Sequence, residues 1–358
     1  LKTALEINEK ALEIHNELGY LRGIYESTGY LAAIKFMTGH VSEARKLFEK
    51  QLRIFEEMKD DNESNAKVYN NMASTAVDLT EKQQILEKAI DVAKQHKDKR
   101  LHSVSLGNLA DLFHKKNQFE EAEKAYQKAL TIAREIGDRY YISYHSCGLA
   151  ILKTDKGDYD QAVKMLQEYY ETSRETGIRY GEAEALGYMA IALMKKGKLE
   201  RALSAFDKSL LILRELNYVH YIYYFQADKA RTLFLLGRLP EADATARESN
   251  SLIEKQEKPE PILENDSLLQ RIRFENAATL DEKLDCIRTV RKIVSNTPDS
   301  VSAAIPVYDL WQMIQIPGDD IPEELSPAVL KTELVKILDK AVKEKPSYDI
   351  IFMRNEIK

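Results

Sequence analysis

The stretch that decides the fold is GDYDQA at 157–162, which recurs as GKLERA at 197–202 and as GRLPEA at 237–242. Each copy combines turn residues, one apolar residue and a closing alanine, and successive closing alanines are 40 residues apart. GHVSEA at 39–44 and NQFEEA at 117–122 extend the series. Such a fixed period predicts a repeat array, in which each unit buries its apolar face against the next.

A second column of alanines supports the same period. Eleven or twelve residues before the closing alanines stand Ala33, Ala73, Ala110, Ala150, Ala190 and Ala230. Alanine at both columns lets two helices cross closely, where a larger side chain would separate them. The closing member of one unit is missing in VDLTEKQQ at 77–84, where the turn has lost about two residues.

The apolar spacing within one unit predicts a pair of helices. In 119–136 the apolar residues recur at steps of three and four, which is one face of an α-helix. Gly137 is expected in the left-handed conformation that ends such a helix. Extending this pattern along the chain predicts helix pairs at 20–58, 61–97, 100–137, 140–177, 180–217 and 219–256.

The ends of the chain are less regular. Residues 1–18 match the second helix of a unit, so we expect the array to begin before residue 1. Residues 1–256 are predicted to form the array, as a half repeat plus six pairs. After a proline-containing break at 257–262, helical stretches near 264–276, 280–295, 300–314 and 324–344 are interpreted either as degenerate repeats or as a C-terminal helical cap in 257–358.

Composition excludes several classes of protein. The chain has 358 residues and a formal net charge of −6, which disfavours nucleic acid as the main partner. No apolar run is long enough to cross a membrane. Two distant cysteines, Cys147 and Cys286, do not make a disulfide framework or a metal site, and they fit a reducing cytoplasm. No metal-binding helix motif, P-loop or nucleophile elbow occurs, so no enzyme activity, metal or cofactor is predicted.

These features resemble the tetratricopeptide repeat (TPR) in its 40-residue form. The resemblance rests on the two alanine columns, the glycine turns, and aromatic residues four positions after the closing alanine, at Phe48, Tyr126 and Phe206. This form occurs in kinesin light chains, Pins-like signalling modulators, and MalT-like and Rap-like bacterial regulators. It covers residues 1–256 well and 257–358 weakly. It implies an all-α fold, a right-handed α-α superhelix of stacked helix-turn-helix repeats.

In proteins of this type the first helices of successive pairs line a concave groove, which implies the partner-binding residues of this chain. They are Lys67, Asn71, Asn108, Asp111, Tyr144, Ile151, Glu184, Tyr188, Tyr224 and Arg231. Asn71 and Asn108 share one column, where their amides either bind a peptide backbone or bond helix to helix. The tyrosines that cluster at the starts of first helices are either interface residues or seam residues between helices.

The predicted function is that of a protein–protein interaction scaffold or sensor module, which binds a peptide or helix in the groove as part of a larger regulatory protein. Other domains of the parent chain are further candidate partners. The alternative is a sensor domain of a bacterial regulator that binds a small molecule or signalling peptide. A Rap-like phosphatase regulator and a self-assembling array are less favoured hypotheses. No membrane partner is predicted, and the oligomeric state stays open.

Overall fold

A computed structural model describes residues 2–38, 40–58, 65–255, 262–297, 302–315 and 322–357 of the chain. Within these residues the chain is helical and contains no strand. It divides into two compact units, Leu1–Leu149 and Ala150–Lys358, and the division falls inside helix α8. No helix among the described residues is long and apolar enough to span a membrane.

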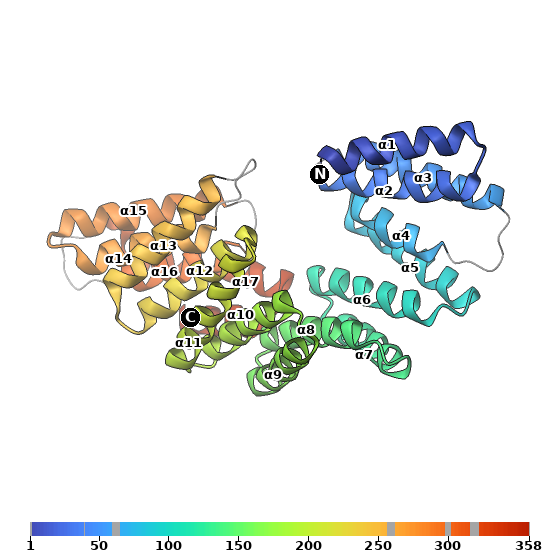
Figure 1. Ribbon diagram of the computed structural model, residues 1–358. Helices are drawn as coiled ribbons and strands as arrows, with labels where there is room; N and C mark the ends of the chain where they lie inside the picture. Colours follow the sequence, from blue (N-terminus) through green and yellow to red (C-terminus); the bar gives the residue numbers. More distant parts are fainter. Residues whose placement is uncertain are drawn as a thin grey trace. The chain divides into compact units, whose positions relative to one another are not determined.

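The first unit contains three helical pairs preceded by a single helix (Figure 1). Its elements are α1 (Lys2–Glu17), α2 (Leu21–Met37), α3 (Val41–Met58), α4 (Ala66–Met72), a short 3-10 helix η1 (Ala73–Thr75), α5 (Leu79–Gln95), α6 (Lys99–Lys115), α7 (Phe119–Glu135) and the start of α8 (Arg139–Asp155). The pairs predicted at 20–58, 61–97 and 100–137 are confirmed, apart from residues 39 and 59–64, which lie outside the described ranges.

The second unit continues with pairs and ends in less regular helices. Its elements after α8 are α9 (Tyr159–Thr176), α10 (Arg179–Lys195), α11 (Leu199–Glu215), α12 (Val219–Leu235), α13 (Leu239–Glu254), α14 (Leu263–Asn276), α15 (Leu280–Asn296), α16 (Ala304–Met313), η2 (Glu323–Leu325), α17 (Pro327–Glu344) and α18 (Tyr348–Ile357). The pairs predicted at 140–177, 180–217 and 219–256 are confirmed, while α18 was not predicted.

The C-terminal helices α14–α17 lie where the sequence predicts helical stretches. Leu268 and Ile272 of α14 share a buried cluster with Ala230 and Ala242, so α14 packs against the last regular pair. A further core joins Phe274 of α14 to α15, α16, α17 and α18. Residues 256–261, which hold most of the expected proline break, lie outside the described ranges, and the division of the chain near 256 stays a prediction.

Helix ends follow the expected chemistry. Gly137 has φ +67°, its N–H donates to the Arg134 carbonyl at 3.1 Å, and the next N–H donates to the Ala133 carbonyl at 3.0 Å. These bonds satisfy carbonyls that the helix end leaves without partners. The left-handed conformation predicted for Gly137 is therefore confirmed, and Asn117 and Asn217 adopt it at the ends of other helices.

The alanine columns are buried in the contacts between helices. Ala110, Ala150, Ala190 and Ala230 are fully buried, as are the closing alanines at 44, 122, 162, 202 and 242. In the first pair the sequence assignment was wrong by one position, because Ala32 and not Ala33 is fully buried. The closing alanines Ala44 and Ala122 are 78 residues apart. Ala32 and Ala110 have the same spacing, whereas Ala33 does not.

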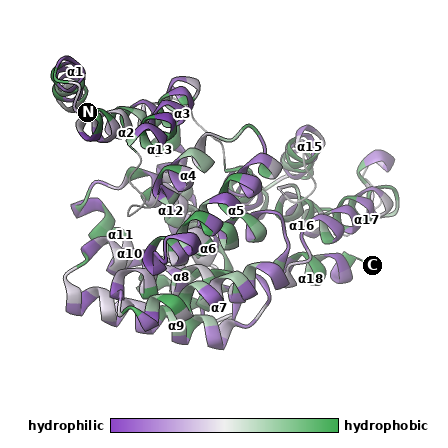
Figure 2. Ribbon diagram, turned by 90° about the vertical axis from the view of Figure 1, so that its right-hand side faces the viewer, coloured by the Kyte–Doolittle hydropathy of each residue, from purple (hydrophilic) through white to green (hydrophobic). Residues whose placement is uncertain are grey.

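The second pair is shortened where its sequence turn has lost residues. Helix α4 passes into η1 and ends at Thr75, and Ala76 is extended. Asp78 then starts α5 by accepting hydrogen bonds from the backbone N–H groups of Thr80 and Glu81 at 2.8 Å. Figure 2 shows hydrophilic and hydrophobic residues alternating along the helices, as one buried face per helix requires.

Candidate functional site

All ten predicted groove residues lie on the first helices of the pairs, namely α4, α6, α8, α10 and α12. Five belong to the first unit and five to the second. In the first unit, Lys67 and Asn71 are exposed on α4. They are therefore accessible to a partner, and among the described residues no hydrogen bond or ion pair of their side chains assigns them a role in the fold.

Asn108 bonds to a neighbouring helix. Its amide donates to the Asn70 side-chain oxygen at 2.9 Å, and the Asn70 amide donates to the Ser105 hydroxyl at 2.7 Å. These bonds join α4 to α6 and satisfy amides that are buried or half-buried. For Asn108 the geometry is therefore that of helix-to-helix bonding, and its partner is Asn70 and not Asn71 of its sequence column.

Asp111 anchors two tyrosines in the first unit. Its carboxylate accepts from the Tyr126 hydroxyl and, at 3.0 Å, from the Tyr144 hydroxyl. Burial raises the pKa of the Asp111 carboxyl, while the two hydroxyls oppose that rise. Tyr144 remains 39% exposed. The bond therefore fixes the position of a tyrosine ring that a partner can still contact.

Glu184 has a similar role in the second unit. Its carboxylate accepts hydrogen bonds from Tyr169 at 2.8 Å, Tyr180 at 2.9 Å and Tyr221 at 3.4 Å. Burial raises the pKa of Glu184, and the hydroxyls oppose the rise. These bonds orient tyrosines from α9, α10 and α12. Glu184 thus fixes the positions of these tyrosines. The bond from the Tyr180 hydroxyl favours the interpretation that Tyr180 is a seam residue between helices.

Arg231 is occupied by the fold. Its guanidinium donates to both carboxylate oxygens of Asp309, at 2.8 and 2.9 Å, and to the Glu264 carbonyl at 3.1 Å. Asp309 on α16 is buried and also accepts from Ser267 at 2.7 Å. Arg231 therefore joins α12 to the C-terminal helices, a function that the sequence did not predict for it.

Two predicted residues of the second unit come together in a pocket of about 290 Å³ between α10 and α12. Tyr188 and Tyr224 line it, and Ile151, which is half-buried on α8, does not. The other lining residues are Ile191, His220, Tyr221, Phe225 and Asp228. Gly187 explains how closely the two helices approach, because a Cβ at this position would lie 2.1 Å from the Phe225 ring.

A comparison with models of known protein families identifies the family to which this chain belongs. The model of the MalT-like TPR region matches residues 70–295. The chain belongs to this family. The comparison with curated protein sequences gives no match.

Solved structures of TPR proteins resemble this MalT-like TPR chain over nearly its whole length. A Rap protein complexed with Competence and Sporulation Factor has a TM-score of 0.61 at 14% identity, with 96% of each chain covered. The apo quorum sensor NprR from B. thuringiensis has a TM-score of 0.57 at 16% identity, covering 99% of this chain and 98% of NprR. The signal transduction ATPase of Pyrococcus horikoshii with a TPR sensor has a TM-score of 0.59 at 14% identity, covering 100% of this chain and 55% of that one. These similarities confirm the expected all-α, TPR-type fold.

The sequence did not single out the full pocket of the MalT-like TPR chain. His220 and Phe225 were not among the predicted residues, and Tyr221 was placed only in the tyrosine cluster and not in the groove, although all three lie one turn from Tyr224 or Asp228 on α12. The available signal was this helical spacing, since residues three and four apart share a face.

A charged cluster near the end of α10 was also missed. Lys195 lies 2.5 Å from Asp349 and 3.6 Å from Asp155, and Lys345 lies 2.9 Å from Asp155. Burial lowers the pKa of Lys195, but Asp349 and Asp155 more than offset this, so the pKa is raised. These pairs link α18, through Asp349, and the end of α17, through Lys345, to α10 and α8 of the MalT-like TPR chain, and no local sequence pattern predicts them.

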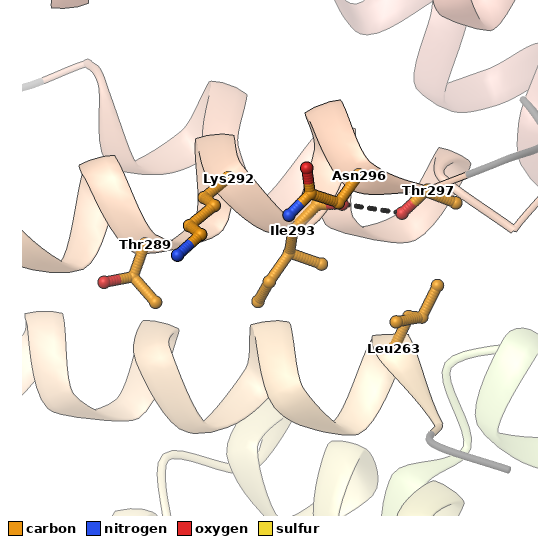
Figure 3. A pocket seen from close by; sticks show the side chains of 6 residues that line it. All are labelled: Leu263, Thr289, Lys292, Ile293, Asn296 and Thr297. Carbon is orange, nitrogen blue, oxygen red and sulfur yellow. Dashed lines mark hydrogen bonds between the residues drawn. The ribbon is translucent and has the colours of Figure 1, made fainter.

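A second pocket, of about 320 Å³, lies between α14 and α15 (Figure 3). It is lined by Leu263, Thr289, Lys292, Ile293, Asn296 and Thr297. Leu263 and Thr297 stand close in sequence to 256–261 and 298–301, which the structure does not describe, so we place no ligand there. Nowhere in the described ranges do three His, Cys, Asp or Glu side chains gather as metal ligands.

Proposed function

We propose that the chain is a regulatory sensor or interaction module, which binds a protein or peptide segment on the face formed by the first helices of its repeats. The pocket between α10 and α12 carries the proposal, because it combines exposed aromatic side chains with one carboxylate on that face. Tyr224 is 40% exposed, and tyrosines in such positions supply much of the energy of protein interfaces.

The size of the pocket favours a peptide side chain over a whole small molecule. Pockets for drug-sized ligands occupy roughly 300 to 1,000 Å³, and this one, at about 290 Å³, is at or below the lower limit. A peptide that lies along the helices would insert one side chain there and extend beyond it. The small-molecule sensor is therefore the second hypothesis.

Similar proteins support a sensing or regulatory role. One similar structure is a Rap protein in complex with Competence and Sporulation Factor, another is a quorum sensor, and a third carries a TPR sensor. Lys67, Asn71 and Tyr144 in the first unit, and Ile151, Tyr188 and Tyr224 in the second, remain the proposed partner contacts. We include a cytoplasmic location and the absence of catalysis in the proposal; Cys147 and Cys286 are buried and not joined in a disulfide, which is compatible with a reducing compartment.

Selection from a random-peptide display library tests this function. We expect wild-type protein to enrich peptides that bind it in solution, and Tyr224→Ala to weaken their binding about tenfold, which is a typical hot-spot loss of about 1.4 kcal/mol. The melting temperature should change little, since the Tyr224 side chain is partly exposed.

Leu211→Ala is the matched control, because Leu211 lies on α11, the second helix of its pair, and is 60% exposed. It should leave peptide binding unchanged. If wild-type protein enriches no peptide above a protein-free surface, the proposal is wrong and the small-molecule sensor becomes the leading hypothesis. If peptides bind but Tyr224→Ala has no effect, the binding face has been misplaced.

A further inference from the structure

The pocket between α10 and α12 has a continuous aromatic wall. The His220 and Tyr224 ring centroids lie 4.9 Å apart, Tyr221 and Phe225 lie 5.9 Å apart, and Phe225 meets Tyr188 edge to face at 5.6 Å. The Tyr221 hydroxyl is directed to Glu184, at 3.4 Å. Aromatic faces carry partial negative charge and attract cations within about 6 Å of the ring centre.

Asp228 adds a carboxylate to this aromatic wall. It lies one turn after Tyr224 and two turns after Tyr221, on the same face of α12. Within the described part of the chain its carboxylate accepts no hydrogen bond. Asp228 is half-buried, and a carboxylate that is partly removed from water without a hydrogen-bond donor is unfavourable. A donor from a ligand would relieve that cost.

The cations nearest to Asp228 are already paired with other carboxylates. Lys195 binds Asp349 and Asp155, and Arg231 binds Asp309 through two hydrogen bonds. Both still interact electrostatically with Asp228, as does Glu264 on α14. The network therefore has three basic side chains against five carboxylates: Lys195, Arg231 and Lys345 against Asp155, Asp228, Glu264, Asp309 and Asp349. Its excess negative charge favours a bound cation.

We propose that this pocket binds the ammonium or guanidinium group of a basic peptide side chain, with Asp228 as its hydrogen-bonding partner and the tyrosine rings around its stem. The proposal rests on the proposed peptide-binding function and names the side chain that the pocket selects. An acidic side chain would face the excess of carboxylates, and a neutral apolar one would leave Asp228 without a partner.

Side-chain mimics test the pocket without any knowledge of the natural peptide. The probes are N-acetyl-arginine methylamide and its neutral isostere N-acetyl-citrulline methylamide, titrated against the full chain by saturation-transfer NMR. We expect the arginine probe to bind at least about tenfold more tightly, because a charge-assisted hydrogen bond contributes about 1.5–3 kcal/mol.

Two variants locate the effect. Asp228→Asn keeps the shape of the side chain and should remove the preference for arginine, whereas Asp91→Asn, an exposed aspartate on α5, should retain it. Tyr224→Ala should weaken the arginine probe several-fold through loss of the cation–π contact. Circular dichroism checks that each variant is folded. If Asp228→Asn does not fold, the effect of Tyr224→Ala and the preference of the wild-type chain for the arginine over the citrulline probe decide whether the pocket binds cations.

The outcomes separate this inference from the proposed function. Preference for arginine that disappears in Asp228→Asn supports the cation pocket. Equal binding of the two probes, or binding of neither, overturns the cation pocket, while the library selection still decides whether the chain binds peptides. Conversely, if the arginine probe binds but the chain enriches no peptide, the cation pocket is supported and a peptide is excluded as the molecule that carries the cation.

Discussion

Buried charges in the second unit fall into two groups with different consequences. Arg231 and Asp309 satisfy each other through two hydrogen bonds across 78 residues of sequence, and the Asp309 side chain is only 6% exposed. Removing one partner of such a pair leaves an unpaired buried charge. Arg231 therefore belongs to the fold, although its position in the repeat is that of a groove residue.

Arg231→Ala should lower the free energy of unfolding by about 3–5 kcal/mol, the usual loss when one partner of a buried ion pair is removed. Chemical denaturation measures this loss. Arg247→Ala removes the partner of Asp243 on α13, where the Arg247 side chain is 69% exposed, and should cost less than about 1 kcal/mol. Equal effects of the two substitutions would contradict the structural role of Arg231.

Asp228 is the opposite case, because none of the described residues donates a hydrogen bond to its carboxylate. Burial raises the pKa of Asp228 to about 7; Glu264 on α14 adds to this rise, while Lys195 on α10 and Arg231 on α12 oppose it. The folded pKa is thus above the unfolded value of about 3.9. Protonation of the Asp228 carboxyl therefore contributes to the free energy of unfolding. This contribution is fully present below the unfolded pKa and is lost as the pH rises toward 7.

Asp228→Asn should therefore stabilise the fold at pH 8, by at most about 4 kcal/mol for a shift of this size. Asparagine is neutral at every pH, so the gain should shrink as the pH falls from 7 to 4 and vanish below that range. Denaturation curves at pH 8, 6 and 4 measure it. A gain that does not depend on pH would show that ionisation of Asp228 is not its cause. A residue whose replacement improves stability but removes cation binding is one retained for binding.

At the scale of elements, helix α18 is held in place by contacts with helices that lie far from it in the sequence. Asp349 accepts from the Tyr159 hydroxyl at 3.1 Å across 190 residues of sequence, and it pairs with Lys195 at 2.5 Å. The Tyr348 ring packs edge to face on Tyr159. Apolar residues of α18, including Ile350 and Ile357, hold it in the C-terminal core as well.

Asp349→Ala should loosen α18 without unfolding the repeats. Hydrogen exchange over 348–357 should accelerate, since two polar links to α9 and α10 are lost, while exchange in α10 should stay nearly unchanged. Hydrogen-exchange mass spectrometry measures both segments. Glu356→Ala, an exposed change on the same helix, is the control. Equal exchange of α18 in the two variants would mean that Asp349 does not hold the helix.

The repeat pattern made the regular elements predictable. Each closing alanine lies in a contact between two helices, and this contact recurs about every 40 residues. Six helix pairs could therefore be placed from the sequence. The error at Ala33 arose because two adjacent alanines, Ala32 and Ala33, both fit the column approximately. Helix α18 and its contacts could not be predicted, because Asp349 pairs with residues that no repeat spacing relates to it.

The candidate site was predictable in part for the same reason. The groove columns identified Tyr188 and Tyr224, which line one pocket, because their position within the repeat fixes the face of the helix. The columns could not show that Arg231 is paired with Asp309, or that Asn108 is bonded to Asn70, since both partners lie on other helices. Spacing assigns a residue to a face, and only the packed structure shows what occupies that face.

At the scale of the whole molecule, membership of the MalT-like TPR family fixes the architecture and leaves the ligand open. One fold can serve many partners, because the stacking of the repeats fixes the architecture while function depends on the side chains that the repeats expose. In this chain that face carries tyrosines held by half-buried acids, at Asp111 in the first unit and at Glu184 in the second. The central claim is that a ligand binds on this face.

Hydroxyl-radical footprinting with a peptide enriched from the display library tests that claim most directly. We predict that saturation with peptide lowers the oxidation of Tyr188 and Tyr224 in the pocket and leaves Tyr170 on α9 unchanged. Protection of Tyr170 on the second helix of its pair, with Tyr188 and Tyr224 as reactive as before, would place the ligand on the other face and contradict the account.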